Sequence, residues 1–169
     1  MQSIRGSLEE WIHASLQAGM DEAGSILSFA QCFTGPLGLT LRRGEAKRCV
    51  KDTAKSGARI RWIDESHALF LPKIGDFQLR LLLGPIAHQL SRIARRPLTA
   101  KELLLALPIS NKERLRWTKD GRLVQQGAAL MKRGQTVSLT TYAVAPVQAL
   151  LADPAEIQRW REEDLWLET

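Results

Sequence analysis

Apolar residues recur at helical spacing near the start of the chain and predict two helices there. Ser7 and Glu10 have the spacing of a capping box, in which each side chain bonds the other residue's backbone N–H. The apolar positions of residues 8–16 then follow a helical period, which predicts an amphipathic helix. We expect the apolar run Ile26–Phe33 to form a second helix, which ends before Gly35-Pro36.

In the middle of the chain, the spacing of apolar residues changes from that of a helix to that of β-strands and back to that of a helix. The spacing over Glu45–Lys55 predicts a short helix. Alternation over Ala58–Ile63 and the return run His67–Leu71 predict the two strands of a β-hairpin. The pattern of Asp76–Arg95 fits a strand or a helix at first, and a helix from about Pro85 onward.

Two further capping boxes lie close together in the second half of the chain. Thr99 with Glu102 predicts one helix start, and Ser110 with Glu113 predicts the next. This spacing leaves a first helix of about seven residues, a tight turn, and a second helix that ends at Gly121. A short helix, a turn and a second helix are the plan of a helix-turn-helix.

The segments that follow predict a wing and two closing helices. The short stretches Arg122–Val124 and Thr136–Leu139 are expected to pair as strands joined by a loop. Pro146–Leu151 and Pro154–Leu167 have helical spacing, and proline suits the start of the second of them. The last helix either covers the core or mediates a dimer.

Together these elements predict an α+β fold that is mainly α-helical and divided at Arg96-Pro97. A proline disfavours helical backbone at the residue before it, so the preceding helix should stop here. We expect residues 1–96 to form a small α/β module with a β-hairpin, which serves accessory DNA contact or dimerisation. Residues 97–169 should form a winged helix-turn-helix with C-terminal helices.

Charge is distributed unevenly along the 169 residues, whose formal net charge is +6. Residues 42–62 carry eight basic and two acidic side chains, a net of +6. Residues 92–133 carry eleven basic and three acidic side chains, a net of +8. Residues 134–169 carry two basic and six acidic side chains, a net of −4. The two basic blocks favour a polyanionic partner.

The second helix of the pair is the predicted recognition helix. Its residues long or polar enough to reach DNA are Asn111, Lys112, Arg116 and Lys119. Lysine and arginine bind phosphates, and arginine or asparagine can also read base edges. We expect Trp117 to anchor this helix to the core. Lys132 and Arg133 lie in the predicted wing loop, where they would hold phosphates; an ordinary solvated hairpin is the alternative.

Several residues of this segment resemble those of a known family. The matching residues are Thr99-Ala100-Lys101-Glu102-Leu103, Ile109-Ser110 and Trp117-Thr118-Lys119-Asp120-Gly121-Arg122-Leu123. They resemble the MerR and excisionase-like winged helix domains, over about a quarter of the chain. The resemblance implies that Ser110 caps the recognition helix and that Arg122 opens the wing near the DNA backbone. The family usually has an apolar residue where this chain has Arg114, so either the helix is rotated slightly or Arg114 faces DNA.

A basic stripe is also predicted in the first half of the chain. Lys47, Lys51 and Lys55 are four residues apart on one face of the predicted helix. Arg59 and Arg61 share a face of the strand that follows. Few acidic residues offset them, whereas a surface helix normally mixes the two signs. We expect a second DNA contact with little sequence preference; the alternative is a solvated helix face.

Residue types of catalytic and metal sites are present, but not in the patterns that such sites need. The three histidines are scattered and have no ligand-spaced partners. Cys32 and Cys49 fit neither a zinc pair nor a disulfide framework, and we expect buried or partly buried thiols. Asp64-Glu65 precedes His67 at the predicted hairpin tip, where turns favour such residues. We therefore expect no enzyme activity, no metal and no cofactor.

Sequence-specific binding of double-stranded DNA is the function that these features favour, in a bacterial transcriptional regulator or an excisionase-like accessory factor. A homodimer is left open. The alternative is a protein-interaction or adaptor module on a helix-turn-helix scaffold; a nucleic-acid-processing enzyme is weaker. The N-terminus does not resemble a signal peptide and no apolar run reaches the length of a membrane helix. We expect a cytoplasmic, nucleoid-associated protein without membrane contact.

Overall fold

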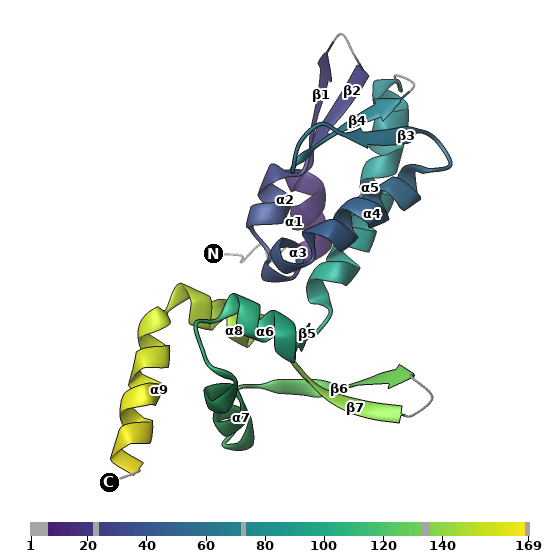
Figure 1. Ribbon diagram of the computed structural model, residues 1–169. Coiled ribbons are helices and arrows are strands. Elements are labelled where there is room, and N and C mark those ends of the chain that lie inside the picture. Colours follow the sequence, from purple (N-terminus) through teal and green to yellow (C-terminus); the bar gives the residue numbers. More distant parts are fainter. Residues whose placement is uncertain (1–6, 22–23, 72–73, 133–135, 168–169) are drawn as a thin grey trace. The chain divides into compact units, whose positions relative to one another are not determined.

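The computed structural model describes residues 7–21, 24–71, 74–132 and 136–167, with the backbone alone for residues 21, 128–132 and 136–138. These residues form nine helices and seven strands (Figure 1). The expected α+β fold, mainly α-helical, is confirmed. The chain divides into two compact units, Met1–Arg95 and Arg96–Thr169, a division one residue from the boundary expected at Arg96-Pro97.

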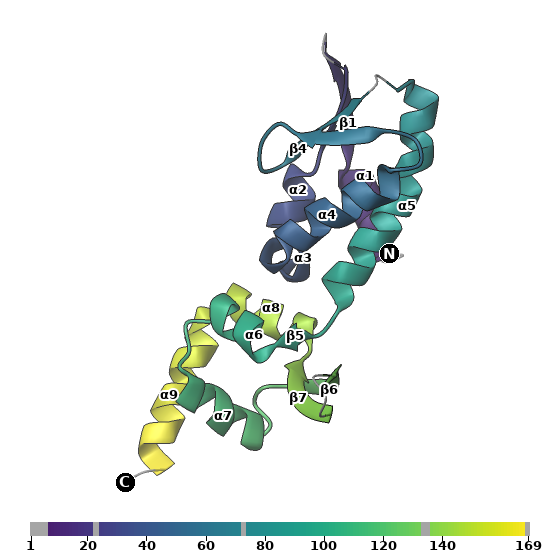
Figure 2. The same cartoon turned by 45° about the vertical axis from the view of Figure 1, so that its right-hand side comes forward.

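The described part of the N-terminal unit contains five helices and four strands. In chain order they are α1 (Leu8–Ser15), β1 (Gln17–Asp21), β2 (Gly24–Ser28), α2 (Ala30–Thr34), α3 (Leu37–Leu41), α4 (Arg43–Ala54), β3 (Arg59–Trp62), β4 (His67–Leu71) and α5 (Asp76–Arg95). Helix α1 begins at the predicted capping box, because Ser7 and Glu10 each accept a hydrogen bond from the other's backbone N–H. Helices α4 and α5 lie side by side (Figures 1 and 2).

The four strands of this unit form one antiparallel sheet in the order β1-β2-β4-β3. The predicted hairpin is present as β3 and β4. Strand β2 also pairs with β4 and sets Leu27 opposite Ala68. The expectation of a helix over Ile26–Phe33 is therefore wrong in its first part, since the chain is strand as far as Ser28 and helical only from Ala30. A strand distant in sequence supplies the backbone partners here, which the local apolar pattern does not reveal.

One face of the sheet packs on the helices and forms the core of the N-terminal unit. Its largest fully buried side chains include Phe29, Phe33, Phe70, Ile12 and Leu90. Helix α5 is continuous through Pro85, which settles the choice between strand and helix that the sequence left open there. Within the part of the chain described, no helix combines the length and the apolar character needed to cross a membrane.

The described part of the C-terminal unit holds a helix-turn-helix and a hairpin. In chain order its elements are β5 (Leu98–Thr99), α6 (Ala100–Ala106), α7 (Asn111–Lys119), β6 (Gln125–Lys132), β7 (Thr136–Tyr142), α8 (Val144–Ala152) and α9 (Pro154–Leu167). Helices α6 and α7 begin at the two predicted capping boxes, and both reciprocal hydrogen bonds form in each box. Helix, turn, helix and two-stranded hairpin follow one another in the order of a winged helix-turn-helix.

Strands β6 and β7 form the wing, and β5 pairs with β7 to complete a three-stranded sheet in the order β5-β7-β6. The prediction of a first wing strand over Arg122–Val124 is wrong, because β6 begins at Gln125. The backbone N–H of Leu123 donates to the carbonyl of Trp117, 2.8 Å away. This bond turns the chain back onto α7 before the strand can begin.

The wing has an irregular base. The register between β6 and β7 shifts between Gln125 and Ala128, and Gly127 between them has a φ of +87°. A bulge at a glycine with positive φ is a common way to bend a strand. The backbone of Lys132 ends β6, whereas its side chain and the whole of Arg133 lie outside the described residues.

Helices α8 and α9 close the C-terminal unit, and α9 runs beside α7 (Figures 1 and 2). Helix α9 buries Ile157, Trp160 and Asp164, so it covers the core. The fully buried ring of Trp117 on α7 meets the Trp160 ring edge-on, with centroids 5.0 Å apart. The expectation that Trp117 anchors its helix to the core is thereby confirmed.

Candidate nucleic-acid interface

Helix α7 has three sides with different surroundings, and these decide which of its side chains can reach a ligand. One side packs on α9 and the core, a second meets Tyr142 at the end of β7, and a third is exposed. Ser110 caps the helix, since its hydroxyl accepts the backbone N–H of Glu113 at 3.2 Å. The residues of α7 expected to contact DNA are Asn111, Lys112, Arg114, Arg116 and Lys119, and they are spread over all three sides.

A single buried carboxylate, Asp164 of α9, holds the inner side of α7. It accepts a hydrogen bond from the indole Nε1 of Trp117 at 2.9 Å. It also pairs with Arg116 at 3.1 Å and with Arg122 at 2.5 Å. Burial alone would raise the pKa of Asp164, but the hydrogen bonds from Arg122, Trp117 and Arg116 outweigh it and leave that pKa below its usual value. Asp164 is therefore an ionised centre that fixes three side chains.

Arg122 is half-buried in the C-terminal unit. Its guanidinium lies 5.6 Å from the ring centroid of Trp117 and 5.8 Å from that of Trp160. One guanidinium thus lies within cation–π distance of both rings, and it also pairs with Asp120 at 2.6 Å. The resemblance placed Arg122 near the DNA backbone, whereas this geometry uses its charge to fix the start of the wing.

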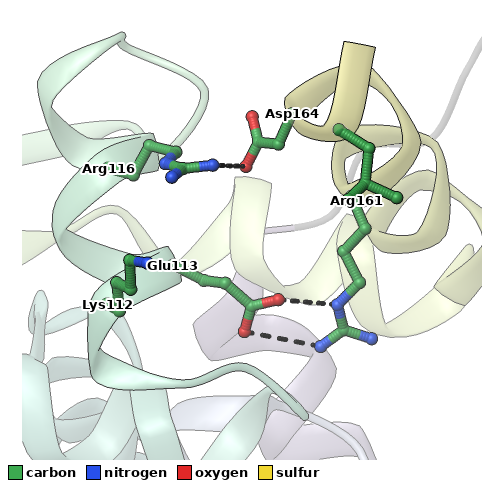
Figure 3. Close-up of a pocket in the computed structure, with 6 residues that line it drawn as sticks. Lys112, Glu113, Arg116, Arg161 and Asp164 are labelled. Carbon is green, nitrogen blue, oxygen red and sulfur yellow. Dashed lines mark hydrogen bonds and ion pairs between the residues drawn. The ribbon is translucent and has the colours of Figure 1, made fainter. Parts of the chain in front are cut away.

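A second ion pair joins α7 to α9. Arg161 donates from Nε to Glu113 at 2.7 Å and from Nη2 to the carbonyl of Pro108 in the turn, also at 2.7 Å. Figure 3 shows this pair beside the pair of Arg116 with Asp164, on the wall of a pocket of about 250 Å³. The first turn of α7 is thus connected to α9 as well as its middle.

The Glu113 pair should make the C-terminal unit sensitive to acid. The hydrogen bond from Arg161, followed by those from Ser110, lowers the pKa of Glu113 from its usual 4.5 to about 2. Because the carboxyl has the lower pKa when folded, its contribution to stability is complete above pH 4.5 and is lost as the pH falls from 4.5 towards 2. We expect that contribution to be about 1–2 kcal/mol, since the pair is partly exposed.

Thermal melting at pH 7 and pH 3 tests this expectation. Glu113→Gln, which can still cap the helix, should melt below the wild type at pH 7 and approach it at pH 3. Glu162→Gln removes an exposed carboxylate of α9 that does not pair with Arg161 and serves as the control. If Glu113→Gln shows the same difference from the wild type at both pH values, the pair does not depend on ionisation of Glu113.

The second side of α7 faces the end of β7. Arg114 donates from Nη1 to the hydroxyl of Tyr142 at 2.7 Å and from Nε to the side-chain oxygen of Asn111 at 2.9 Å. The hydroxyls of Thr118 and Tyr142 lie 2.9 Å apart. Arg114 is half-buried and bonds Tyr142 at the end of the wing rather than pointing straight out.

The third side of α7 is exposed and carries its remaining polar groups. Its residues are Asn111, Lys112, Leu115 and Lys119, and we call them the exposed α7 face. Lys112 and Lys119 have no ion pair within the described residues. Leu115 is 54% exposed at the centre of this face and is its one apolar side chain. Sequence reasoning passed over it because only polar side chains were considered.

The N-terminal basic stripe is divided by the fold. Lys47 is drawn away from it, because its amine lies 4.8 Å from the ring centroid of Trp62 and 3.7 Å from the carboxylate of Glu65. Lys51 on α4 and Lys55, the residue that caps the C-terminal end of α4, remain exposed. Arg59 and Arg61 are both exposed on β3, on the opposite face from the buried Ile60.

The other residue types that can serve catalytic or metal sites have structural roles in this fold. The carboxylate of Asp64 accepts the backbone N–H groups of Ser66 and His67 at 2.7 and 2.8 Å, so it forms the turn of the β3–β4 hairpin. Cys32 is buried and Cys49 half-buried, both as free thiols, as expected. Burial raises the pKa of the Cys32 thiol to about 11, which makes it a poor nucleophile. The described residues contain no cluster of metal-ligating side chains.

Comparison with family models, with curated proteins and with solved structures gives no match to this chain. The functional interpretation therefore depends on the geometry of α7, its supports and the basic surfaces.

Proposed function

We propose that this protein binds double-stranded DNA by placing the exposed α7 face in the major groove. The observation that carries the proposal is this face, on the second helix of a helix-turn-helix and immediately before a two-stranded wing. The major groove of B-DNA is wide enough to admit an α-helix, and the second helix of this motif is the one that enters it. The rest of α7 is occupied by contacts within the unit.

The four residues of the face differ in chemistry, and this sets their proposed roles. Lys112 and Lys119 carry exposed charges, which suit phosphates. Asn111 is bound through its side-chain oxygen by Arg114, but that oxygen has a second lone pair and the amide N–H groups remain, so the side chain can pair with an adenine edge. Leu115 offers an apolar surface, which suits the methyl group of thymine.

Arg116 and Arg122 have positioning roles in this proposal. Both are bound to Asp164, so neither can reach a base without breaking an ion pair inside the unit. They fix the angle at which α7 leaves the turn and the point at which the wing begins. The protein acts by binding alone, as a bacterial transcriptional regulator or an excisionase-like accessory factor does.

Selection of bound sites from random duplex DNA by the full chain, followed by footprinting of the selected sites, tests the proposal. A recurrent short motif is the expected result. Enrichment of no motif, together with affinity that does not change between duplexes of different sequence, would reject sequence-specific recognition.

Leu115 provides a sharper prediction on the selected site. Replacing a contacted thymine by uracil removes one methyl group and should weaken wild-type binding by about 0.8 kcal/mol. Leu115→Ala should weaken binding to the thymine site and should lose most of its sensitivity to the replacement, because the two changes remove the same contact. Lys119→Ala is the matched control and should keep the full sensitivity. Equal sensitivity in Leu115→Ala and the wild type at every thymine would remove Leu115 from the recognition surface.

A protein-interaction module is the second candidate. The observation that favours it is the exposed apolar end of α9, where Leu165, Trp166 and Leu167 are 67%, 82% and 83% exposed. Helices that bind a protein partner present apolar side chains in this way. If site selection yields no motif and Trp166→Ser abolishes self-association measured by sedimentation, this candidate is preferred over DNA binding.

A further inference from the structure

The N-terminal unit carries a basic groove between the end of α4 and the start of β3. Its volume is about 440 Å³, and its lining residues are Lys51, Asp52, Lys55, Ala58, Arg59 and Ile60. We call it the α4–β3 groove. Ala58 and Ile60 are buried and form its floor. Lys51, Lys55 and Arg59 are exposed and form its rim, with Asp52 as the single carboxylate.

The cations of the rim differ from Lys47 and Arg80 of the same unit, which are ion-paired. Lys47 pairs with Glu65 at 3.7 Å, and Arg80 pairs with Asp76 at 2.8 Å. Lys51, Lys55 and Arg59 have no ion pair within the described residues. Asp52 is the one carboxylate that lines the groove, so its three cations leave a net positive charge there.

We infer that the α4–β3 groove binds phosphates of a nucleic-acid backbone and gives the protein a second, sequence-independent contact with duplex DNA. This inference rests on the proposed function, since it takes duplex DNA as the partner. Lysines one helical turn apart offer neighbouring point charges with rotatable donors, which hold phosphates without reading bases. An acidic peptide fits less well, because the floor of the groove exposes almost no apolar surface for its side chains.

The inference can be tested by measuring how the full chain binds a random-sequence duplex. Fluorescence anisotropy gives the affinity at salt concentrations between 50 and 200 mM. The variant Lys51→Ala/Lys55→Ala/Arg59→Ala should flatten the slope of log K against log salt by about 2.7, because each lost phosphate contact removes about 0.9. The matched control is Arg48→Ala/Arg80→Ala/Arg92→Ala, which removes the same charge from exposed arginines of the same unit outside the groove. It should retain most of the wild-type slope.

A second variant moves affinity in the opposite direction. Asp52→Asn removes the carboxylate of the groove and should strengthen duplex binding severalfold, a result that a purely structural role of these residues does not produce. All the substituted side chains are exposed, so melting temperatures should stay close to that of the wild type. Asp52→Asn tests the groove independently if the triple variant folds poorly.

The α7 variant Lys112→Ala/Lys119→Ala separates failure of this inference from failure of the proposed function. If it weakens binding while the groove triple variant and Asp52→Asn bind like the wild type, the inference is overturned and the proposed function stands. If the groove variants change binding and the α7 variant does not, the inference holds and the proposed function fails. Absence of duplex binding by the wild type overturns both. Loss of poly-glutamate binding without loss of duplex binding in the triple variant overturns the inference in favour of an acidic peptide.

Discussion

Trp117→Ala is expected to lower the free energy of unfolding of the C-terminal unit by about 3–5 kcal/mol, the usual loss for a buried indole cut back to alanine. Trp117 is fully buried between α7 and α9, with the Trp160 ring edge-on at 5.0 Å. Its indole N–H also bonds Asp164, and the guanidinium of Arg122 lies over its ring. Removal of the ring leaves a cavity, and it also takes one contact each from the carboxylate of Asp164 and the guanidinium of Arg122. A loss of this size is a large part of the stability of a small unit.

Hydrogen-exchange mass spectrometry of the full chain measures this effect, because it reports each unit separately. Peptides from α7 and α9 should lose protection in Trp117→Ala, while those from α4 and α5 should keep it. Trp166→Ala, which removes an indole that is 82% exposed, is the control and should leave protection unchanged. Unchanged protection in Trp117→Ala combined with loss of DNA binding would instead mean that Trp117 contacts DNA.

Asp164→Ala is expected to destabilise the same unit by about 3 kcal/mol or more. One carboxylate accepts from Trp117, Arg116 and Arg122, and it is buried. Its removal leaves the buried indole N–H of Trp117 without an acceptor and takes one ion-pair partner from Arg116 and one from Arg122. Breaking a buried pair from one side costs about 3–5 kcal/mol. Asp164→Asn keeps an acceptor for Trp117 and should lose less.

Asp120→Ala is the matched control, because Asp120 also pairs with Arg122 but is exposed. An exposed ion pair contributes about 1 kcal/mol or less. Chemical denaturation of the three aspartate variants should rank their destabilisation as Asp164→Ala, then Asp164→Asn, then Asp120→Ala. Equal losses for Asp164→Ala and Asp120→Ala would show that Asp164 does not hold the inner side of α7.

Local signals in the sequence were sufficient for the helix-turn-helix. Both capping boxes involve residues three apart, so the bonds that start α6 and α7 could be predicted from neighbours in the chain. The β3–β4 hairpin was also predictable, since its strands are adjacent and alternate in polarity. The strand β2 was missed because its pairing with β4 depends on residues some forty positions away.

The surroundings of the candidate site could not be predicted in the same way. The residue type of Arg116 and the family resemblance at Arg122 both predict contact with DNA, but Asp164, more than forty positions away, binds both. One signal was present: Asp164 shares the otherwise apolar face of α9 with Ile157 and Trp160, and a carboxylate on such a face needs a buried partner. Pairing between segments distant in sequence thus decides which cations remain available for a ligand.

The most direct test of DNA recognition by α7 is the salt dependence of duplex binding. The cations without an ion pair that the account assigns to phosphates are Lys51, Lys55, Arg59, Lys112 and Lys119. Five phosphate contacts predict a slope of log K against log salt of about −4.5 for the wild type. Lys112→Ala/Lys119→Ala should bring it to about −2.7 and weaken binding to the selected site.

The matched control for this measurement is Arg80→Ala/Arg159→Ala, which also removes two positive charges, but from arginines that are ion-paired within the protein. The control should keep a slope near that of the wild type, while Lys112→Ala/Lys119→Ala should lose nearly two units of it. A slope and an affinity for Lys112→Ala/Lys119→Ala that both match the wild type would contradict the central claim that α7 binds DNA.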